Sequence, residues 1–439
     1  MGEAPPLGYR AVTALSRFLL RLFYPRLEMI GAEAIPRRGP LIVAANHHNS
    51  LVDAMMLVAL VPRWLRTLAN APLFRHPLIG PFLKAMGGLP VHRRQEAGND
   101  PSRNQALFDA TTAALRKGGA IMLFPEGRTQ PEPVLLELRT GAARMLLEAH
   151  AKGPLDLPVA LLPVGLVFRD PGTFREGEAL VLVGEPVDTT EALSLAPAQP
   201  EEAARRLTEK LADALREVIV EAGDRETLSL LRLAQDIWAD GAARRALPPV
   251  EGIAWLKNAL AAFRSLEGVR PAEASRLRDA LAECARSLEE ARLSVSDLSR
   301  GPGLSSPSTL VALALSAPLA LLGLLAHIVP YKLTGRAVAR ILKDEEEEAT
   351  DKIAAGFVFF LLAWAAEAAL AYRFAGPVAA VALLAAVLPL GFVTIWWMET
   401  ANRLAHERRV RRAFNDGTAA RLRERCIHLA EDFGRIASA

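Results

Sequence analysis

Three apolar stretches in the last third of the chain place the strongest limit on how it can fold. They span residues 309–329, 353–372 and 378–397, and each approaches the roughly 20 residues that a helix needs to cross a bilayer. The second and third are apolar around the whole helix, which favours membrane insertion over the alternative, burial in a soluble core. Gly376 and Pro377 between them predict a tight turn and therefore a hairpin.

Basic residues flank this hairpin and set its expected orientation. Four Lys or Arg lie between residues 332 and 343 and five Arg between 403 and 412, whereas the turn carries only Arg373. Positive charge near the ends of a span stays in the cytoplasm, so we expect both flanks there. Because Pro318 interrupts the first stretch and Pro330 ends it, residues 309–329 are expected to form a re-entrant or in-plane element.

Composition favours phospholipid over nucleic acid as the anionic partner. The 439 residues are 51% hydrophobic, and a mean hydropathy of +0.18 is high for a wholly soluble protein. Charge is nearly balanced, with 52 Lys and Arg against 49 Asp and Glu, so no nucleic-acid footprint follows. Cys284 and Cys426 are far apart in the sequence and lack metal-ligand spacing, which fits a reducing compartment and argues against a disulfide scaffold.

Periodicity divides the rest of the chain. From residue 27 to 187, short strand-like runs alternate with helical ones, and this alternation predicts an α/β fold, a mixed sheet flanked by helices. Helical periodicity with many Arg and Glu follows. The expected divisions are an interfacial amphipathic helix (1–25), the α/β domain (26–199), a helical region (200–304), the membrane region (305–398) and a basic helical tail (399–439). A helix packed on the domain is the alternative for residues 1–25.

A run of polar residues, Asn-His-His-Asn-Ser-Leu-Val-Asp at 46–53, follows the apolar strand-like stretch 41–45. It places an imidazole at a strand end and the carboxylate of Asp53 about one helical turn into the next element. That arrangement is suited to orienting a general base. Adjacent residues of an extended chain point in opposite directions, so only one of His47 and His48 can readily meet Asp53.

Four further segments carry polar groups or glycine where strands end and helices begin. Together with the first run they supply a base with an orienting acid, donors for an anion and room for close backbone approach. Each residue alone also has a structural explanation: Glu126 could cap a helix, and Arg93 could be a solvated surface charge. It is improbable that such explanations hold for all of these residues together. The segments are 87–94 (Gly-Gly-Leu-Pro-Val-His-Arg-Arg), 124–129 (Phe-Pro-Glu-Gly-Arg-Thr), 139–141 (Arg-Thr-Gly) and 162–165 (Leu-Pro-Val-Gly), the last expected to close a strand.

These ordered segments resemble the blocks of the glycerolipid acyltransferase family, which includes lysophosphatidate and glycerol-3-phosphate acyltransferases. The resemblance covers residues 26–186 and is closest to a bacterial membrane-bound branch that is similar to fungal-type glycerol-3-phosphate acyltransferases. The family's usual His-x4-Asp pattern selects His48 with Asp53. The branch reads Asn-His-Pro-Asn-Ser-x-x-Asp, which selects His47, and we favour His47 as the base.

The resemblance implies direct acyl transfer from acyl-CoA or acyl-carrier protein as co-substrate, with no other cofactor and no metal. The histidine would take the proton of an acceptor hydroxyl while Asp53 fixes the imidazole tautomer. Glu126 would bind glycerol hydroxyls. Arg93 and Arg128 would hold the phosphate. In segment 124–129 the arginine stands one position earlier than in the family's usual Phe-Pro-Glu-Gly-Thr-Arg-Ser block, so Arg139 could take the place of Arg128. The substrate-binding set that the resemblance implies is Asn49, Ser50, Arg93, Glu126, Gly127, Arg128, Thr129 and Arg139.

The expected function is therefore acylation of lysophosphatidate in phospholipid biosynthesis. The expected location is the bacterial inner membrane, with the catalytic domain on the cytoplasmic face. Glycerol-3-phosphate or another lysophospholipid is the alternative acceptor. A catalytically inactive, lipid-binding membrane scaffold is the alternative of another class, and a transporter is disfavoured because three apolar stretches provide little wall for a pathway.

Overall fold

The computed structural model describes residues 4–76, 79–91, 101–130, 132–241, 247–303, 305–341 and 347–437. The chain forms two compact units. The first comprises Met1–Glu221 and Val338–Ala354, and the second comprises Ala222–Ala337 and Ala355–Ala439.

A seven-stranded mixed sheet forms the centre of the first unit, in the order β1-β7-β6-β2-β5-β3-β4. All neighbouring strands are parallel except β6 and β7, which pair antiparallel. The mixed sheet predicted from the alternation is thus confirmed. The strands are β1 (Arg26–Ile30), β2 (Leu41–Ala45), β3 (Leu65–Asn70), β4 (Leu89–Val91), β5 (Ala120–Leu123), β6 (Ala160–Arg169) and β7 (Glu178–Val183).

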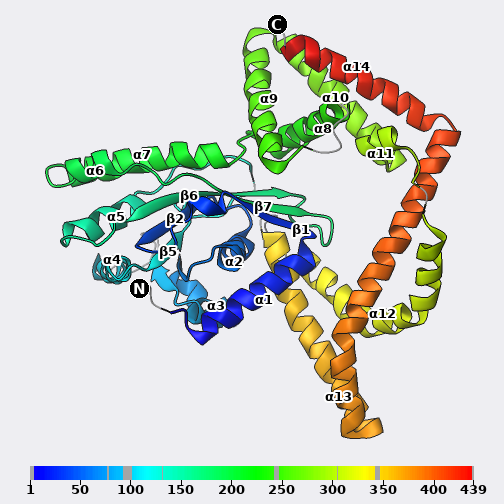
Figure 1. Cartoon of the computed structure of the whole chain (residues 1–439), viewed down its shortest axis with the longest axis horizontal. Helices are drawn as coiled ribbons and strands as arrows, with labels where there is room; N and C mark the ends of the chain where they lie inside the picture. The colour runs from blue at the N-terminus through cyan, green and yellow to red at the C-terminus, as the bar shows by residue number, and fades with distance from the viewer. Residues whose placement is uncertain are drawn as a thin grey trace. The chain divides into compact units, whose positions relative to one another are not determined.

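Helices cover both faces of this sheet (Figure 1). The fully buried strand β2 shows why: Leu41 and Val43 join the core cluster with α1 and α2, while Ile42 between them is equally buried and faces the other side. On that other side α5 and α7 pack on the strands. The helices are α1 (Leu7–Phe23), α2 (Ser50–Leu60), α3 (Ile79–Ala85), α4 (Pro101–Arg116), α5 (Gly141–Ala151), α6 (Thr190–Leu195) and α7 (Pro200–Val218), with 3-10 turns η1 (Ala32–Ala34) and η2 (Ala71–Arg75).

Helix α1 packs mainly on α2, and also on α3 and the edge strand β1, through its apolar face. Leu20 and Phe23 are buried in the core, and the Arg17 guanidinium donates to the Ala59 carbonyl at 2.7 Å. Phe18 on the outer face is 41% exposed. The apolar residues of α1 therefore contribute to the core of the first unit, and an interfacial role of its outer face stays a prediction.

The segment 162–165 does not close a strand as the sequence suggests, because β6 continues to Arg169. The reason for Gly165 lies in packing: a Cβ built there would be 1.8 Å from the Val218 carbonyl oxygen at the end of α7. The close backbone approach at this glycine is thus made by a helix of the same unit. Helix α7 belongs to this unit, so the predicted boundary between residues 199 and 200 falls inside it.

Five helices and the C-terminal end of a sixth, which contributes Val410 and Ala413, pack around an apolar core in the second unit. Leu277 and Leu281 of α10 and Leu422 of α14 are among the buried residues. Cys284 and Cys426, far apart in the sequence, lie with their Sγ atoms 3.7 Å apart as free thiols. The helices are α8 (Arg225–Gly241), α9 (Pro249–Val269), α10 (Pro271–Ala291), α11 (Val295–Arg300) and α14 (Thr418–Ala437).

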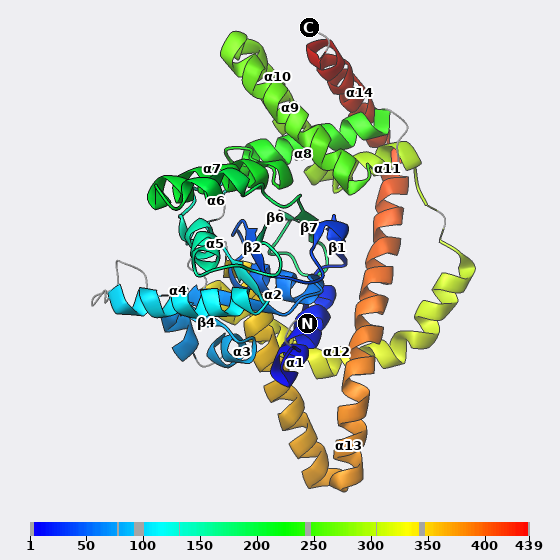
Figure 2. The same cartoon turned by 60° about the vertical axis from the view of Figure 1, so that its left-hand side comes forward.

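Two further helices, α12 (Pro307–Ile341) and α13 (Glu348–Asn415), are long and apolar enough to cross a membrane. Non-helical backbone at Gly376 divides α13 where the sequence predicts the turn, and both views show its two arms running back from that end (Figures 1 and 2). The expectation that Pro330 ends the first apolar stretch as a helix is wrong. Helix α12 bends but continues through both of its prolines, and the Thr334 hydroxyl donates to the Pro330 carbonyl at 2.8 Å.

Packing at Gly165 gives a stability prediction. Gly165→Ala should lower the free energy of unfolding by about 1–3 kcal/mol, because the added methyl collides with backbone that cannot rotate away. The matched control is Gly141→Ala at the start of α5, where a Cβ meets nothing within 4 Å. Thermal unfolding of the full chain measures both; equal midpoints for the two variants would contradict the packing argument.

Candidate functional site

The polar run 46–53 begins with a side chain that fixes the end of β2. Asn46 is fully buried, its Nδ2 donates to the Leu166 carbonyl at 2.9 Å, and its Oδ1 accepts the Leu166 N–H at 2.6 Å. One amide thus bonds both backbone groups of a residue on β6, as a neighbouring strand would. No role was predicted for Asn46, but its amide anchors the loop that carries both histidines.

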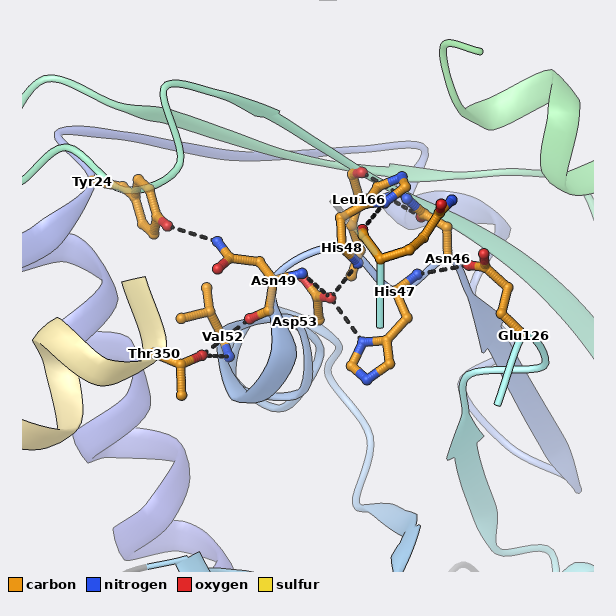
Figure 3. A network of polar contacts seen from close by, with 11 residues as sticks. Tyr24, Asn46, His47, His48, Asn49, Val52, Asp53, Glu126, Leu166 and Thr350 are labelled. Atoms are coloured by element: carbon orange, nitrogen blue, oxygen red, sulfur yellow. Dashed lines mark hydrogen bonds and ion pairs between the residues drawn. The ribbon is translucent and has the colours of Figure 1, made fainter. Parts of the chain in front are cut away.

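Asp53 is the centre of the site (Figure 3). Its carboxylate is fully buried in the first turn of α2. Oδ2 contacts Nδ1 of His47 at 2.9 Å and accepts the backbone N–H groups of His48 and Asn49, each at 2.8 Å. The chain closes around this oxygen because Ser50 adopts a left-handed conformation with φ of 46°, uncommon for a residue with a side chain. Asp53 thereby fixes both the loop and the imidazole.

The ring that meets Asp53 belongs to His47. Its side chain is 18% exposed, and the ring stacks on Phe124 with centroids 3.9 Å apart. Because Nδ1 donates to Asp53, the neutral ring carries its lone pair on Nε2, which Figure 3 shows turned away from the carboxylate. An exposed edge with a basic nitrogen is what a general base requires.

The His48 ring turns the other way. Its Nδ1 lies 3.0 Å from the Gln130 carbonyl, and only its backbone contacts Asp53. The Gln130 N–H donates to the His47 carbonyl at 3.1 Å, so the loop after β5 is tied to both histidines. Neighbouring residues point in opposite directions, as expected for extended chain.

Glu126 lies beneath the same loop. It is only 3% exposed, Oε1 accepts the His47 N–H at 2.9 Å, and Oε2 accepts the Leu136 N–H at 3.0 Å. Burial raises the pKa of Glu126, against the lowering effect of these donors and of the two nearby imidazoles. The residue expected to bind substrate hydroxyls therefore has both oxygens bonded to backbone and holds the peptide of His47.

The remaining residues after β5 are closer to the surface. Gly127 has φ of 72°, and a Cβ there would lie 2.6 Å from Nε of Arg139, so the guanidinium packs directly on the glycine. The Arg139 side chain is exposed, and the backbone N–H of Arg139 donates to the Pro125 carbonyl at 2.8 Å. Arg128 is also exposed and Thr129 is half-buried. Two cations thus flank the loop that contacts the histidines.

Arg93, the other residue expected to bind phosphate, lies in 92–100, outside the described residues. Within the described part of the chain, no group of three or more His, Cys, Asp or Glu side chains is arranged to hold a metal ion.

Asn49 is buried, and its side chain supports the loop from behind. Nδ2 donates to the Tyr24 hydroxyl at 3.1 Å, which in turn donates to the Pro171 carbonyl at 2.8 Å. Burial raises the pKa of Tyr24, so the phenol stays neutral. The Thr350 hydroxyl donates to the Asn49 carbonyl at 3.2 Å. Sequence reasoning found neither Tyr24 nor Thr350, because no spacing links them to the run 46–53.

Several known proteins are similar to this chain in sequence. The family model described as Acyltransferase matches residues 26–166. An uncharacterized acyltransferase of Schizosaccharomyces pombe is 26% identical over 53% of this chain and 47% of its own length. Glycerol-3-phosphate O-acyltransferase 2 of Saccharomyces cerevisiae is 29% identical over 34% of this chain and 20% of its own. The chain spans about half the length, or less, of these two relatives.

Two bacterial proteins are also similar. The 1-acyl-sn-glycerol-3-phosphate acyltransferase of Bacillus subtilis is 26% identical over 37% of this chain and 73% of its own length. The crystal structure of the 1-acyl-sn-glycerophosphate acyltransferase of Thermotoga maritima aligns with a TM-score of 0.35 and 21% identity, over 48% of this chain and 78% of that chain.

The burial of Glu126 predicts a pH-dependent stability. With its pKa raised in the folded state, the folded chain keeps this proton to higher pH than the unfolded chain does. Between these two pKa values the wild type therefore loses stability as pH rises, whereas Glu126→Gln does not titrate. The thermal midpoint of Glu126→Gln minus that of the wild type should therefore increase as the pH is raised from about 4 towards 7. A constant difference, or the same trend in the exposed control Glu137→Gln, would contradict this reasoning.

Proposed function

We propose that this chain, whose residues 26–166 match the Acyltransferase family model, transfers a fatty acyl group from a thioester to the hydroxyl of lysophosphatidate. The observation that carries the proposal is the pair formed by His47 and Asp53, a partly exposed imidazole oriented by a fully buried carboxylate. Relatives named for acylation of glycerol-3-phosphate and of 1-acylglycerol-3-phosphate support this chemistry.

The proposed reaction needs no covalent enzyme intermediate. Nε2 of His47 accepts the proton of the acceptor hydroxyl, and Asp53 stabilises the imidazolium that forms. The oxygen then attacks the thioester carbonyl of acyl-CoA or acyl-carrier protein, the carbon–sulfur bond breaks, and the departing thiolate takes the proton from His47. The ester and a free thiol are the products, so atoms and charge balance.

The acceptor phosphate would be held by the arginines near the loop. Arg128 and Arg139 are exposed close to the Glu126 loop, and guanidinium groups bind phosphate through charge-assisted hydrogen bonds. Arg93 joins them in the proposal. The same set would serve glycerol-3-phosphate or another lysophospholipid, since all of these acceptors carry a hydroxyl and a phosphate on one glycerol unit.

We also propose that α12 and α13 hold the enzyme in the bacterial inner membrane, with its site at the cytoplasmic face. Both helices have the length and hydropathy for this role, and only 17% and 11% of their most apolar windows are buried within the protein. A lipid product would then be released where its chain is stable, because each CH₂ buried in lipid contributes about 0.8 kcal/mol.

Single substitutions of the two histidines test which one acts as the base. His47→Ala should lower kcat by about 10²- to 10⁴-fold with little change in KM, because it removes a proton acceptor used in the transition state. His48→Ala loses the contact of its ring with the Gln130 carbonyl but leaves the His47–Asp53 pair in place, so it should keep most of the activity. Steady-state kinetics on the full chain in detergent measure both. If only His48→Ala abolishes turnover, His47 is not the base.

An acceptor panel tests the substrate. Purified full chain is offered lysophosphatidate, glycerol-3-phosphate and lysophosphatidylcholine, each with acyl-CoA and with acyl-carrier protein, and His47→Ala serves as the blank. Lysophosphatidate should give the highest kcat/KM. No turnover with any pair would favour the inactive scaffold over the enzyme.

Reporter fusions test the membrane topology. A reporter placed before Ser306 should report the cytoplasm, because the basic flanks of α13 are retained there and residues 309–329 are expected to return to the same side. A fusion after Phe374, at the tip of the hairpin, is the matched control and should report the periplasm. A periplasmic signal before Ser306 would mean that α12 crosses fully.

A further inference from the structure

The N-terminal turn of α2 is capped by a side chain that lies about 300 positions later in the chain. Asn49, at the N-cap position, makes no side-chain cap bond of its own, since its amide is turned to Tyr24. The Val52 N–H is 3.4 Å from the Thr350 hydroxyl oxygen and 3.0 Å from the Asn49 carbonyl. The Thr350 hydroxyl itself donates to that carbonyl at 3.2 Å. Thr350 therefore supplies the hydroxyl that an N-cap Ser or Thr would supply.

Thr350 is held firmly in this place. It is 7% exposed and stands in the first turn of α13, between the buried residues Ala349 and Ile353, which belong to the same core cluster as Val52. Two residues after Thr350, the Nζ of Lys352 donates to the Gly172 carbonyl at 2.7 Å. Packing on both sides leaves the hydroxyl aimed at α2, as Figure 3 shows.

From Thr350 the bonded path to the reacting group is short. Thr350 bonds the carbonyl of Asn49, the N–H of Asn49 bonds Oδ2 of Asp53, and the same oxygen contacts Nδ1 of His47. The carbonyl and the N–H of Asn49 belong to adjacent peptide units that meet at the Asn49 Cα, so a shift of this residue changes the donors around the one oxygen that orients the imidazole. Thr350 lies outside residues 26–166, in the helix that continues as an apolar arm.

We propose that Thr350 is a positioning residue for the His47–Asp53 pair, capping α2 from the base of α13. The inference rests on the proposed function. The start of α13 would then have a second role besides anchoring. The first turn of α13 completes the hydrogen bonds that hold the loop 46–53, so this loop depends on a helix far along the chain.

The test compares Thr350→Val, which keeps the shape and removes the hydroxyl, with Thr350→Ser, which keeps the hydroxyl. On the full chain in detergent, Thr350→Val should lower kcat about tenfold with KM for both substrates unchanged, because a loosened loop misplaces the imidazole in the transition state. Thr350→Ser should restore most of the rate. Lys352→Met is the matched control: it removes a tie of the same helical turn without touching α2 and should keep wild-type kcat.

Hydrogen exchange of peptides covering residues 46–60 gives a readout that is independent of activity. Thr350→Val should speed exchange there, and Lys352→Met should not, because only the former uncaps α2. Wild-type kcat and unchanged exchange in Thr350→Val would overturn the inference, as would equal loss in Lys352→Met or no rescue by Ser. An inactive wild type would refute the proposed function instead, while the exchange data would still decide whether Thr350 caps α2.

Discussion

One buried carboxylate oxygen organises the site. Oδ2 of Asp53 contacts the His47 ring and accepts two consecutive backbone N–H groups, so it defines both the path of the chain and the direction of the imidazole. It lies in the first turn of α2, where the helix N-terminus carries partial positive charge. Without this oxygen the residues 47–49 would have no common partner.

The other polar contacts keep that oxygen in place from different parts of the fold. Asn46 ties the loop to β6, Glu126 holds the His47 peptide from the loop after β5, and Tyr24 and Thr350 hold Asn49 from behind. Most of these groups are buried and bonded to backbone, which makes the loop costly to distort. The result is an imidazole at the end of β2 whose Nε2 is turned away from Asp53.

The sequence predicts the parts of this arrangement that depend on local pattern. Alternating strand and helix periodicity gives the mixed sheet, and the opposite directions of neighbouring residues separate His47 from His48. Gly376 marks the turn of α13 because a backbone with positive φ favours glycine. Long-range contacts were not predictable: nothing near Thr350 signals a bond 301 positions away, and the proline at 330 was wrongly expected to end a helix. Glu126 was expected to bind substrate. Its burial beneath His47 could not be predicted, because that burial depends on tertiary packing.

The most direct measurement of the central claim is the protonation of the His47 ring. Histidine-selective ¹⁵N NMR of the full chain in detergent, with His47→Gln used for assignment, reports which ring nitrogen carries the proton in the neutral form. The account predicts that His47 is protonated on Nδ1 and bare on Nε2, and that Asp53→Ala removes this preference. A His47 ring protonated on Nε2, or one unaffected by the loss of Asp53, would contradict it.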